Sequence, residues 1–197
     1  MSNQLHLLFS TPIGVSELDN PSAYSSICNE EYYFNSDDVL VSKDKFILDK
    51  YRTLREAILR EVHNYARSSM ACDQEMRITQ SWAIKSNSSL QFHQHPNSII
   101  SGAFYVNADS ASSEIRFLKP YVSGQIKWET NSDLYKNQDW LWDYVSFKPH
   151  TGKLILFPSY INHGIVSNNM DSNRCVLSFN TWFVNPIGSV DKLTFLD

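Results

Sequence analysis

The chain has 197 residues, a net charge of −4 and a pI of about 5.8, which suits a single domain large enough to bury a substantial core. Scattered Lys and Arg argue against nucleic acid as a partner, because binding to phosphates requires clustered positive charge. No apolar stretch is long enough to span a membrane, and no signal-peptide pattern is visible. Three widely spaced cysteines argue against a disulfide framework, so we expect a reducing, cytoplasmic environment.

The N-terminal third contains the clearest helix. Residues 5–15 suggest an extended segment broken by Pro12, and residues 16–38 show no period and are predicted to be irregular. Over residues 46–66 apolar side chains recur at steps of three and four, which predicts an amphipathic helix. Its apolar stripe contains Ile47, Tyr51, Leu54, Ile58, Val62 and Tyr65.

From Met76 onward apolar side chains recur at every second residue. Alternation over 76–84 predicts a half-buried strand, with Trp82 and Ile84 on one face and Ser81 and Ala83 on the other. Further strand-like runs follow at 99–106, 114–118, 153–157 and 174–184. Short β runs without α/β alternation predict an antiparallel sandwich or barrel. We therefore expect one mainly β domain over residues 1–197, with flanking helical support at about 45–68 and a β core at about 76–185.

Residues 119–150 fit no period and carry several aromatic side chains. Long loops inside compact domains are uncommon and often functional. Two interpretations are open: a loop whose aromatics pack it onto the barrel, or a lid that lines a substrate pocket.

Three histidines form a candidate metal site. His93 and His95 would point the same way on a strand, and neutral imidazole is a strong ligand for Fe, Zn, Cu or Ni. His163 follows within a turn of Pro158, where the apolar run 154–157 should end because proline lacks the ladder N–H. The competing interpretations are a surface histidine pair and a structural His163.

Arg174 opens the last strand-like run and shares its parity with Val176, Ser178 and Asn180. If that face is the barrel interior, a buried guanidinium needs an anion, and a carboxylate fits its planar fork. The alternative is a surface arginine at the start of a strand.

Three motifs together resemble a known family. They are His-x-His-Pro-Asn-Ser-x-x-Ser-Gly-x-x-Tyr-Val from residue 93, Gly-x-x-x-x-Phe-Pro-Ser-x-x-x-His from residue 152, and Arg-x-x-x-Ser-Phe-Asn from residue 174. This pattern is similar to that of the 2-oxoglutarate/Fe(II)-dependent oxygenases, most closely a small group common in marine bacteria and their phages. Leu-Phe-Ser-Thr-Pro-Ile at 8–13 extends the likeness over nearly the whole chain.

The resemblance implies a double-stranded β-helix of the jelly-roll or cupin-like type, with Fe(II) at one mouth of the barrel. It assigns His93 and His163 as ligands, and it pairs Arg174 with the distal carboxylate of 2-oxoglutarate. Ser178 and Tyr105 are candidate hydroxyl partners for that carboxylate. Asn97 is either a polar pocket residue or part of an ordinary Pro-Asn-Ser turn.

The chain departs from the wider superfamily at one ligand, because His95 stands where Asp or Glu is usual. We expect His93, His95 and His163 to form a three-histidine site, one charge more positive than the usual set. The alternatives are that His95 lies outside the ligand set and a distant acid such as Glu114 or Asp171 completes it, or that the chain binds no functional metal.

The function predicted on this basis is a 2-oxoglutarate- and O2-dependent Fe(II) oxygenase that hydroxylates a small-molecule or peptide substrate, releasing succinate and CO2. The first rival is a cupin-type metal dioxygenase or isomerase that does not use 2-oxoglutarate, and the second is a non-catalytic β-sandwich binding module. The substrate stays open, because fold-level likeness does not identify it. A homodimer also stays open.

Overall fold

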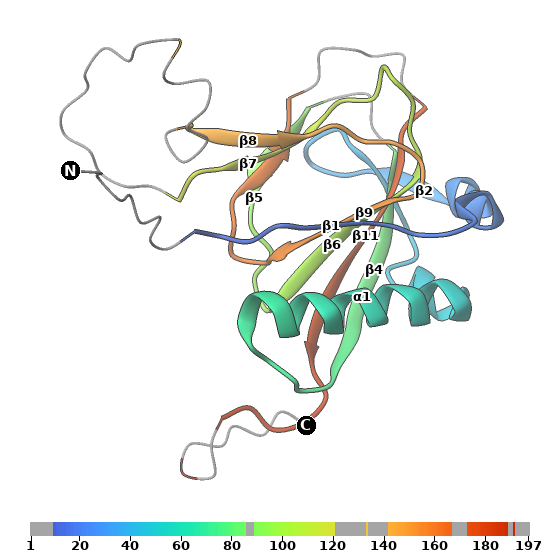
Figure 1. The fold of residues 1–197 in the computed structure, drawn as a ribbon. Helices are drawn as coiled ribbons and strands as arrows, with labels where there is room; N and C mark the ends of the chain where they lie inside the picture. The colour runs from blue at the N-terminus through green and yellow to red at the C-terminus, as the bar shows by residue number, and fades with distance from the viewer. Residues whose placement is uncertain are drawn as a thin grey trace.

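The computed structural model describes residues 10–85, 89–120, 133, 142–166, 173–188 and 191. Within these residues no helix is long and apolar enough to cross a membrane. The described strands form two antiparallel sheets, one of seven strands and one of four. Figure 1 shows how these strands are arranged. This is the predicted mainly β barrel of the double-stranded β-helix type.

The larger sheet has the strand order β1-β9-β6-β11-β4-β3-β2 and the smaller sheet the order β5-β10-β7-β8. In the larger sheet the strands are β1 Gly14–Glu17, β2 Tyr32–Phe34, β3 Leu40–Ser42, β4 Met76–Lys85, β6 Ile100–Asn107, β9 Lys153–Pro158 and β11 Cys175–Phe183. In the smaller sheet they are β5 Leu90–His93, β7 Ile115–Leu118, β8 Tyr144–Phe147 and β10 His163–Ile165. Apart from the β2–β3 pair, the neighbours in both sheets are far apart in sequence, so the barrel depends on long-range pairing.

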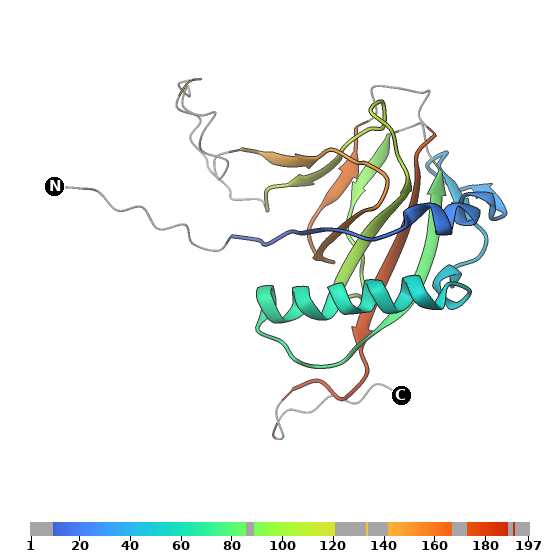
Figure 2. The same ribbon diagram turned by 45° about the vertical axis from the view of Figure 1, so that its right-hand side comes forward.

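The predicted helix is present but begins later than expected. A 3-10 turn, η2, covers Ile47–Asp49, and α1 runs over Arg52–Met70 and ends where Ala71 adopts a left-handed φ of 49°. Leu54, Ile58 and Val62 of its apolar stripe are fully buried against the outer face of the larger sheet, which α1 crosses in Figure 2, whereas Tyr51 is only partly buried. This burial, rather than helix propensity, supplies most of the stability of such a helix.

Alternation along the central strands separates two cores. In β11, Cys175, Leu177 and Phe179 pack on the α1 side, whereas Val176 packs on the opposite side toward the smaller sheet. The inner core joins residues of both sheets: Ala103, Tyr105, Ile115, Phe117, Ile155, Phe157, Ile161 and Val176. The inner face of the larger sheet therefore forms one wall of the barrel interior, which is the condition under which Arg174 was expected to be buried.

β4 departs from the predicted half-buried strand because both of its faces are covered. The pairing with β11 shifts register so that Asn180 faces Gln80 while Thr181 faces Ile78, which leaves Thr79 as the extra residue of a bulge. Beyond the bulge Ser81 and Ala83 are buried on the outer side, where Leu48 N–H donates to Ser81 Oγ at 2.9 Å. The single alternating pattern predicted over 76–84 is wrong, because the bulge exchanges the faces.

Two segments predicted to lack regular structure contain elements. The stretch 16–38 holds a 3-10 helix, η1 at Pro21–Asn29, followed by β2, which pairs with β3 at the edge of the larger sheet. The stretch 119–150 includes β8, which pairs with β7. The rest of that aromatic stretch, 121–132 and 134–141, lies outside the described residues, so its predicted role stays a prediction.

Candidate metal centre and cosubstrate pocket

A cavity of about 470 Å³ lies between the inner face of the larger sheet and the smaller sheet. Its walls come from the β2–β3 edge, from β4, β6 and β11, and from β5 and β10 of the smaller sheet. His93, His95, His163 and Arg174, which were predicted as site residues from three separate motifs, all line it.

The three histidines meet although they come from different positions in the fold. His93 ends β5 and His163 begins β10, and the two are direct partners across these strands. His95 lies beyond the end of β5, where its backbone N–H donates to Ser159 O at 2.9 Å. One ring nitrogen of each histidine lies within 4.8 Å of the other two. The expected convergence of His93 and His95 is present, although His95 is not itself in a strand.

Each of the three imidazoles has its Nδ1 next to an oxygen acceptor. His93 Nδ1 lies 2.8 Å from Gln91 O, His163 Nδ1 lies 3.0 Å from Ile161 O, and His95 Nδ1 lies 2.8 Å from Asn180 Oδ1. Because these oxygens only accept, they favour the proton on Nδ1 and leave the lone pair on Nε2. The Nε2 atoms of His95 and His163 are 3.2 Å apart, which is the arrangement that a shared cation stabilises.

Burial keeps two of these imidazoles neutral. Burial, together with smaller contributions from the neighbouring histidines, lowers the pKa of His163 to about 3 and that of His95 to about 4. Hydrogen bonds to Ile161 O and to Asn180 act in the opposite direction and are smaller effects. Neutral imidazole is the form that binds metal, so the site is prepared for a cation at ordinary pH.

The carboxylate alternatives for the third ligand differ in where they lie. Within the described part of the chain, the histidine cluster includes no Asp, Glu or Cys. Glu114 is exposed just before β7 and does not line the cavity. Asp171 lies outside the described residues. The geometry of the described residues therefore favours His95 over Glu114 as the third ligand.

The predicted cosubstrate residues Arg174, Tyr105 and Ser178 line the same cavity and are buried. Arg174 precedes β11 and is only 3% exposed, so the alternative of a surface arginine is wrong. Burial lowers its pKa from the ordinary value. Burial also raises the pKa of Tyr105 to about 12, and the nearby Arg174 opposes that rise. Tyr105 is thus a neutral hydroxyl beside a buried guanidinium.

Asn97 lies apart from these residues. It is exposed in the turn between β5 and β6, adopts a left-handed φ of 58°, and does not line the cavity. Asparagine tolerates this conformation better than most residues. The structure therefore favours the turn role over the pocket role that was predicted for Asn97.

Two parts of the site were missed by reasoning from sequence. Asn180 was placed on the inner face but not given its contact with His95, and Trp82 stacks on the His95 ring with centroids 5.6 Å apart. The β2–β3 edge supplies a further wall, including Tyr33 and Lys45. The alternation of side chains along the strands could have placed Trp82 and Asn180 in the site. Nothing in the local sequence pattern of residues 16–38 indicated that this stretch forms a wall of the cavity.

A family model described as "Putative 2OG-Fe(II) oxygenase" matches residues 80–180, just over half of the chain and the part that holds all three histidines and Arg174. The chain belongs to this family. It is a non-haem 2-oxoglutarate/Fe(II)-dependent oxygenase, as the three motifs predicted. No protein among the curated sequences matches it.

Solved structures of low sequence identity share the oxygenase's fold. HygX from Streptomyces hygroscopicus, with nickel and 2-oxoglutarate bound, has a TM-score of 0.60 at 10% identity, covering 88% of this chain and 84% of its own. The non-heme alpha-ketoglutarate-dependent epimerase SnoN from nogalamycin biosynthesis gives 0.63 at 9% identity, covering 88% and 79%. A Pseudomonas putida prolyl-4-hydroxylase gives 0.53 at 12% identity, covering 89% and 94%. These matches support the double-stranded β-helix.

Family membership decides between the rival functions. The oxygenase is neither a cupin that works without 2-oxoglutarate nor a non-catalytic β-sandwich module. None of these comparisons tests the origin in marine bacteria or phages, which stays a prediction.

Proposed function

We propose that this oxygenase hydroxylates a small-molecule or peptide substrate inside the cavity, with Fe(II) on His93, His95 and His163 and with 2-oxoglutarate on Arg174. The observation that carries the proposal is the convergence of three ring nitrogens within 4.8 Å in the same cavity as a buried arginine. A surface histidine cluster or a structural arginine would not combine these features.

The donor set suits iron. Because each Nδ1 is engaged, Nε2 is the nitrogen that each imidazole keeps for a metal, and one ring nitrogen of each histidine lies within 4.8 Å of the others. Imidazole is a common ligand of non-haem iron. Because His95 replaces the usual carboxylate, the ligands contribute no negative charge. The site should therefore hold an anionic chelating cosubstrate more strongly than the common two-histidine, one-carboxylate set.

The cosubstrate end of the cavity suits a carboxylate. Arg174 offers a planar fork of donors for bidentate pairing, and the hydroxyls of Tyr105 and Ser178 line the same space. Burial excludes competing water, so the ion pair is screened less than a surface pair would be. Arg174 would bind and orient the distal carboxylate, and Tyr105 and Ser178 would complete its hydrogen bonds.

When bound, Fe(II) and 2-oxoglutarate supply, together with O2, the oxidation of a substrate C–H bond to an alcohol while the cosubstrate becomes succinate and CO2. The protein's part is to orient the substrate and to shield the reaction. Val41, Ile84 and Leu90 give the cavity an apolar lining next to Trp82. These walls would limit water around the reacting groups.

A cytoplasmic location is part of this proposal. Cys28, Cys72 and Cys175 are free thiols, and both free thiols and Fe(II) persist best in a reducing compartment. We keep a homodimer as an open expectation.

The direct test uses protein purified without an affinity tag and loaded with Fe(II). Oxygen uptake should require 2-oxoglutarate and should release succinate in equal amount to the CO2 formed, with or without a coupled substrate. His163→Ala should abolish both. Oxygen uptake that is indifferent to 2-oxoglutarate would contradict the proposal, and untargeted metabolite turnover under the same conditions would identify the substrate.

A further inference from the structure

The cavity contains a second cation besides Arg174. Lys45 follows β3 and lines the wall built by the β2–β3 edge, which also carries Tyr33. Its Nζ donates to Ser42 O at 2.8 Å and lies 5.0 Å from the centroid of the Tyr33 ring. Among the described residues no carboxylate lies within ion-pair distance of Lys45. Two of its three N–H donors therefore stay available to a ligand.

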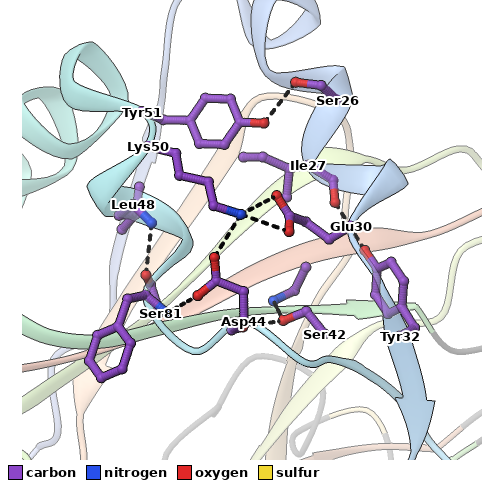
Figure 3. A network of polar contacts seen from close by, with 12 residues as sticks. Ser26, Ile27, Glu30, Tyr32, Ser42, Asp44, Leu48, Lys50, Tyr51 and Ser81 are labelled. Atoms are coloured by element: carbon purple, nitrogen blue, oxygen red, sulfur yellow. Dashed lines mark hydrogen bonds and ion pairs between the residues drawn. The ribbon is translucent and has the colours of Figure 1, made fainter.

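The segment that presents Lys45 is held from several sides, as Figure 3 shows. Lys50 Nζ reaches Asp44 at 2.7 Å and Glu30 at 3.0 Å, and so ties this segment to the end of η1. Ser42 is fully buried: its Oγ donates to Asp44 O at 2.7 Å and accepts from Ala83 N–H at 2.9 Å. A cation on a fixed segment binds a ligand with a smaller loss of conformational entropy.

The backbones of Lys45 and Arg174 lie beside different parts of β4. Ser81 N–H donates to Lys45 O at 2.8 Å, so Lys45 lies beside the middle of β4. Arg174 instead precedes Cys175, which faces Lys85 at the end of β4. The side chain of Lys45 runs back toward Ser42 and Tyr33, so its Nζ lies near the level of Ala83 and Ile84 on β4. In the proposed function the metal holds one end of 2-oxoglutarate and Arg174 holds its distal carboxylate, which leaves Lys45 for another ligand.

The surroundings of Lys45 combine charge with an apolar wall. Trp82 lies on β4 next to this segment, and its ring stacks on that of the proposed ligand His95. Val41, Ile84 and Leu90 form a neighbouring apolar cluster that lines the same cavity. Asp37 is the acidic residue of the described lining, and it is exposed at the rim. The substrate part of the cavity thus offers a cation beside an apolar surface that leads to the histidines.

We propose that Lys45 binds an anionic group of the substrate, and that the substrate class is a small organic anion, a carboxylate or phosphate ester, whose apolar body packs against Trp82. This inference rests on the proposed function for the position of the metal and 2-oxoglutarate. Charge supports it under the same assignment: bound Fe(II) and dianionic 2-oxoglutarate cancel, the three imidazole ligands are neutral, and among the described lining residues Lys45 and Arg174 outnumber Asp37.

The test measures binding by ligand-observed NMR to protein loaded with Mn(II), an inert surrogate, and saturated with 2-oxoglutarate. The probes share one aromatic body and differ in charge: phenylacetate, phenyl phosphate, neutral phenylacetamide and cationic 2-phenylethylamine. The anionic probes should bind roughly 10- to 100-fold more tightly than the amide, the range expected for a hydrogen bond to a charged group. Lys45→Met should remove this preference and Lys45→Arg should keep most of it.

Lys43→Met is the matched control, because Lys43 is two residues away, is exposed, pairs with Glu31 and does not line the cavity. It should bind all four probes as the parent does. The proposal is overturned if the amide binds as well as the anions, if Lys45→Met keeps the anion preference, or if no anionic probe binds. Failure of the proposed function would be visible earlier, as a parent protein that does not bind 2-oxoglutarate before any probe is added. A folded Lys45→Met protein should bind 2-oxoglutarate normally.

Discussion

Asn180 Oδ1 lies 2.8 Å from His95 Nδ1 and accepts a second hydrogen bond from Ser101 Oγ, also at 2.8 Å. Ser101 Oγ in turn contacts Ser159 Oγ at 2.7 Å, in the segment whose backbone carbonyl accepts from His95 N–H. The ring and the backbone of His95 are therefore fixed by one polar network on the inner face of the larger sheet. Such outer contacts orient a metal-binding imidazole and select its tautomer.

The first prediction concerns this contact. Asn180→Ala should weaken metal binding roughly 10- to 100-fold, the usual effect of losing a residue that orients a ligand. Asn180→Asp should retain affinity, because a carboxylate also accepts from Nδ1. Calorimetric titration with Mn(II) measures both. Asn107→Ala, at the exposed far end of β6, is the control and should bind as the parent does. Unchanged affinity in Asn180→Ala would show that Asn180 does not orient a ligand.

The second prediction separates the three-histidine site from its alternatives. His93→Ala or His163→Ala should abolish stoichiometric iron, and His95→Ala should weaken it strongly. His95→Asp should retain iron, because it restores the common ligand set. Metal analysis after gel filtration gives the stoichiometry. If His95→Ala binds iron as the parent does, His95 is not a ligand, and a carboxylate elsewhere, such as Asp171, must be tested.

The third prediction concerns the cosubstrate. At about 100 times its dissociation constant, a ligand that binds only the folded state adds roughly 2.7 kcal/mol, which for a chain of this size raises the Tm by about 5–10 °C. Mn(II)-loaded protein should show this rise with 2-oxoglutarate and much less with succinate, which lacks the keto group. Differential scanning fluorimetry provides the measurement.

Substitution of Arg174 tests the same prediction. Arg174→Ala should sharply reduce the 2-oxoglutarate shift, and Arg174→Lys should lie between, keeping the charge but losing the fork. Arg77→Ala, an exposed arginine on β4, is the matched control and should respond as the parent does. Equal shifts in Arg174→Ala and the parent would remove Arg174 from the cosubstrate site.

The fourth prediction follows from the buried imidazoles. Their pKa values, about 4 for His95 and about 3 for His163, lie below the value of about 6.5 for an unfolded histidine. Between these values the unfolded chain binds more protons than the folded chain, so acid favours unfolding. The stability of the metal-free protein should be fully present above about pH 6.5 and should fall as the pH drops toward 4. Each histidine should contribute a loss of roughly 2 kcal/mol at pH 5.

Urea unfolding at pH 8, 6.5 and 5 in the presence of a chelator measures this loss. In His163→Asn the difference between pH 8 and pH 5 should be smaller than in the parent by about the contribution of one histidine. The low pKa values also mean that His95 and His163 stay unprotonated in the folded protein between pH 5 and 6.5, so their protonation does not weaken metal binding in that range. An identical pH dependence in parent and variant would contradict the assignment of a buried, neutral His163.

Local sequence patterns determined those features that depend on the spacing of residues within a single helix, strand or short motif. Steps of three and four identified α1, and the inward parity of Arg174, Val176 and Ser178 was correct because alternation holds along an uninterrupted strand. The His-x-His motif and the later motif that ends at His163 identified the candidate ligands, because each of these histidines lies at a fixed position within a short motif. These features survive folding because they depend on residues close together in the chain.

Only the tertiary structure decided how these parts meet. The pairing of His93 with His163 joins residues seventy positions apart, and the extra residue Thr79 exchanges the faces of β4 through its partner β11. Lys45 reaches the cavity only because β2 and β3 extend the edge of the larger sheet. Register and sheet order arise from hydrogen bonds between strands that are distant in sequence. The alternation of side chains within one strand does not specify which strand pairs with it.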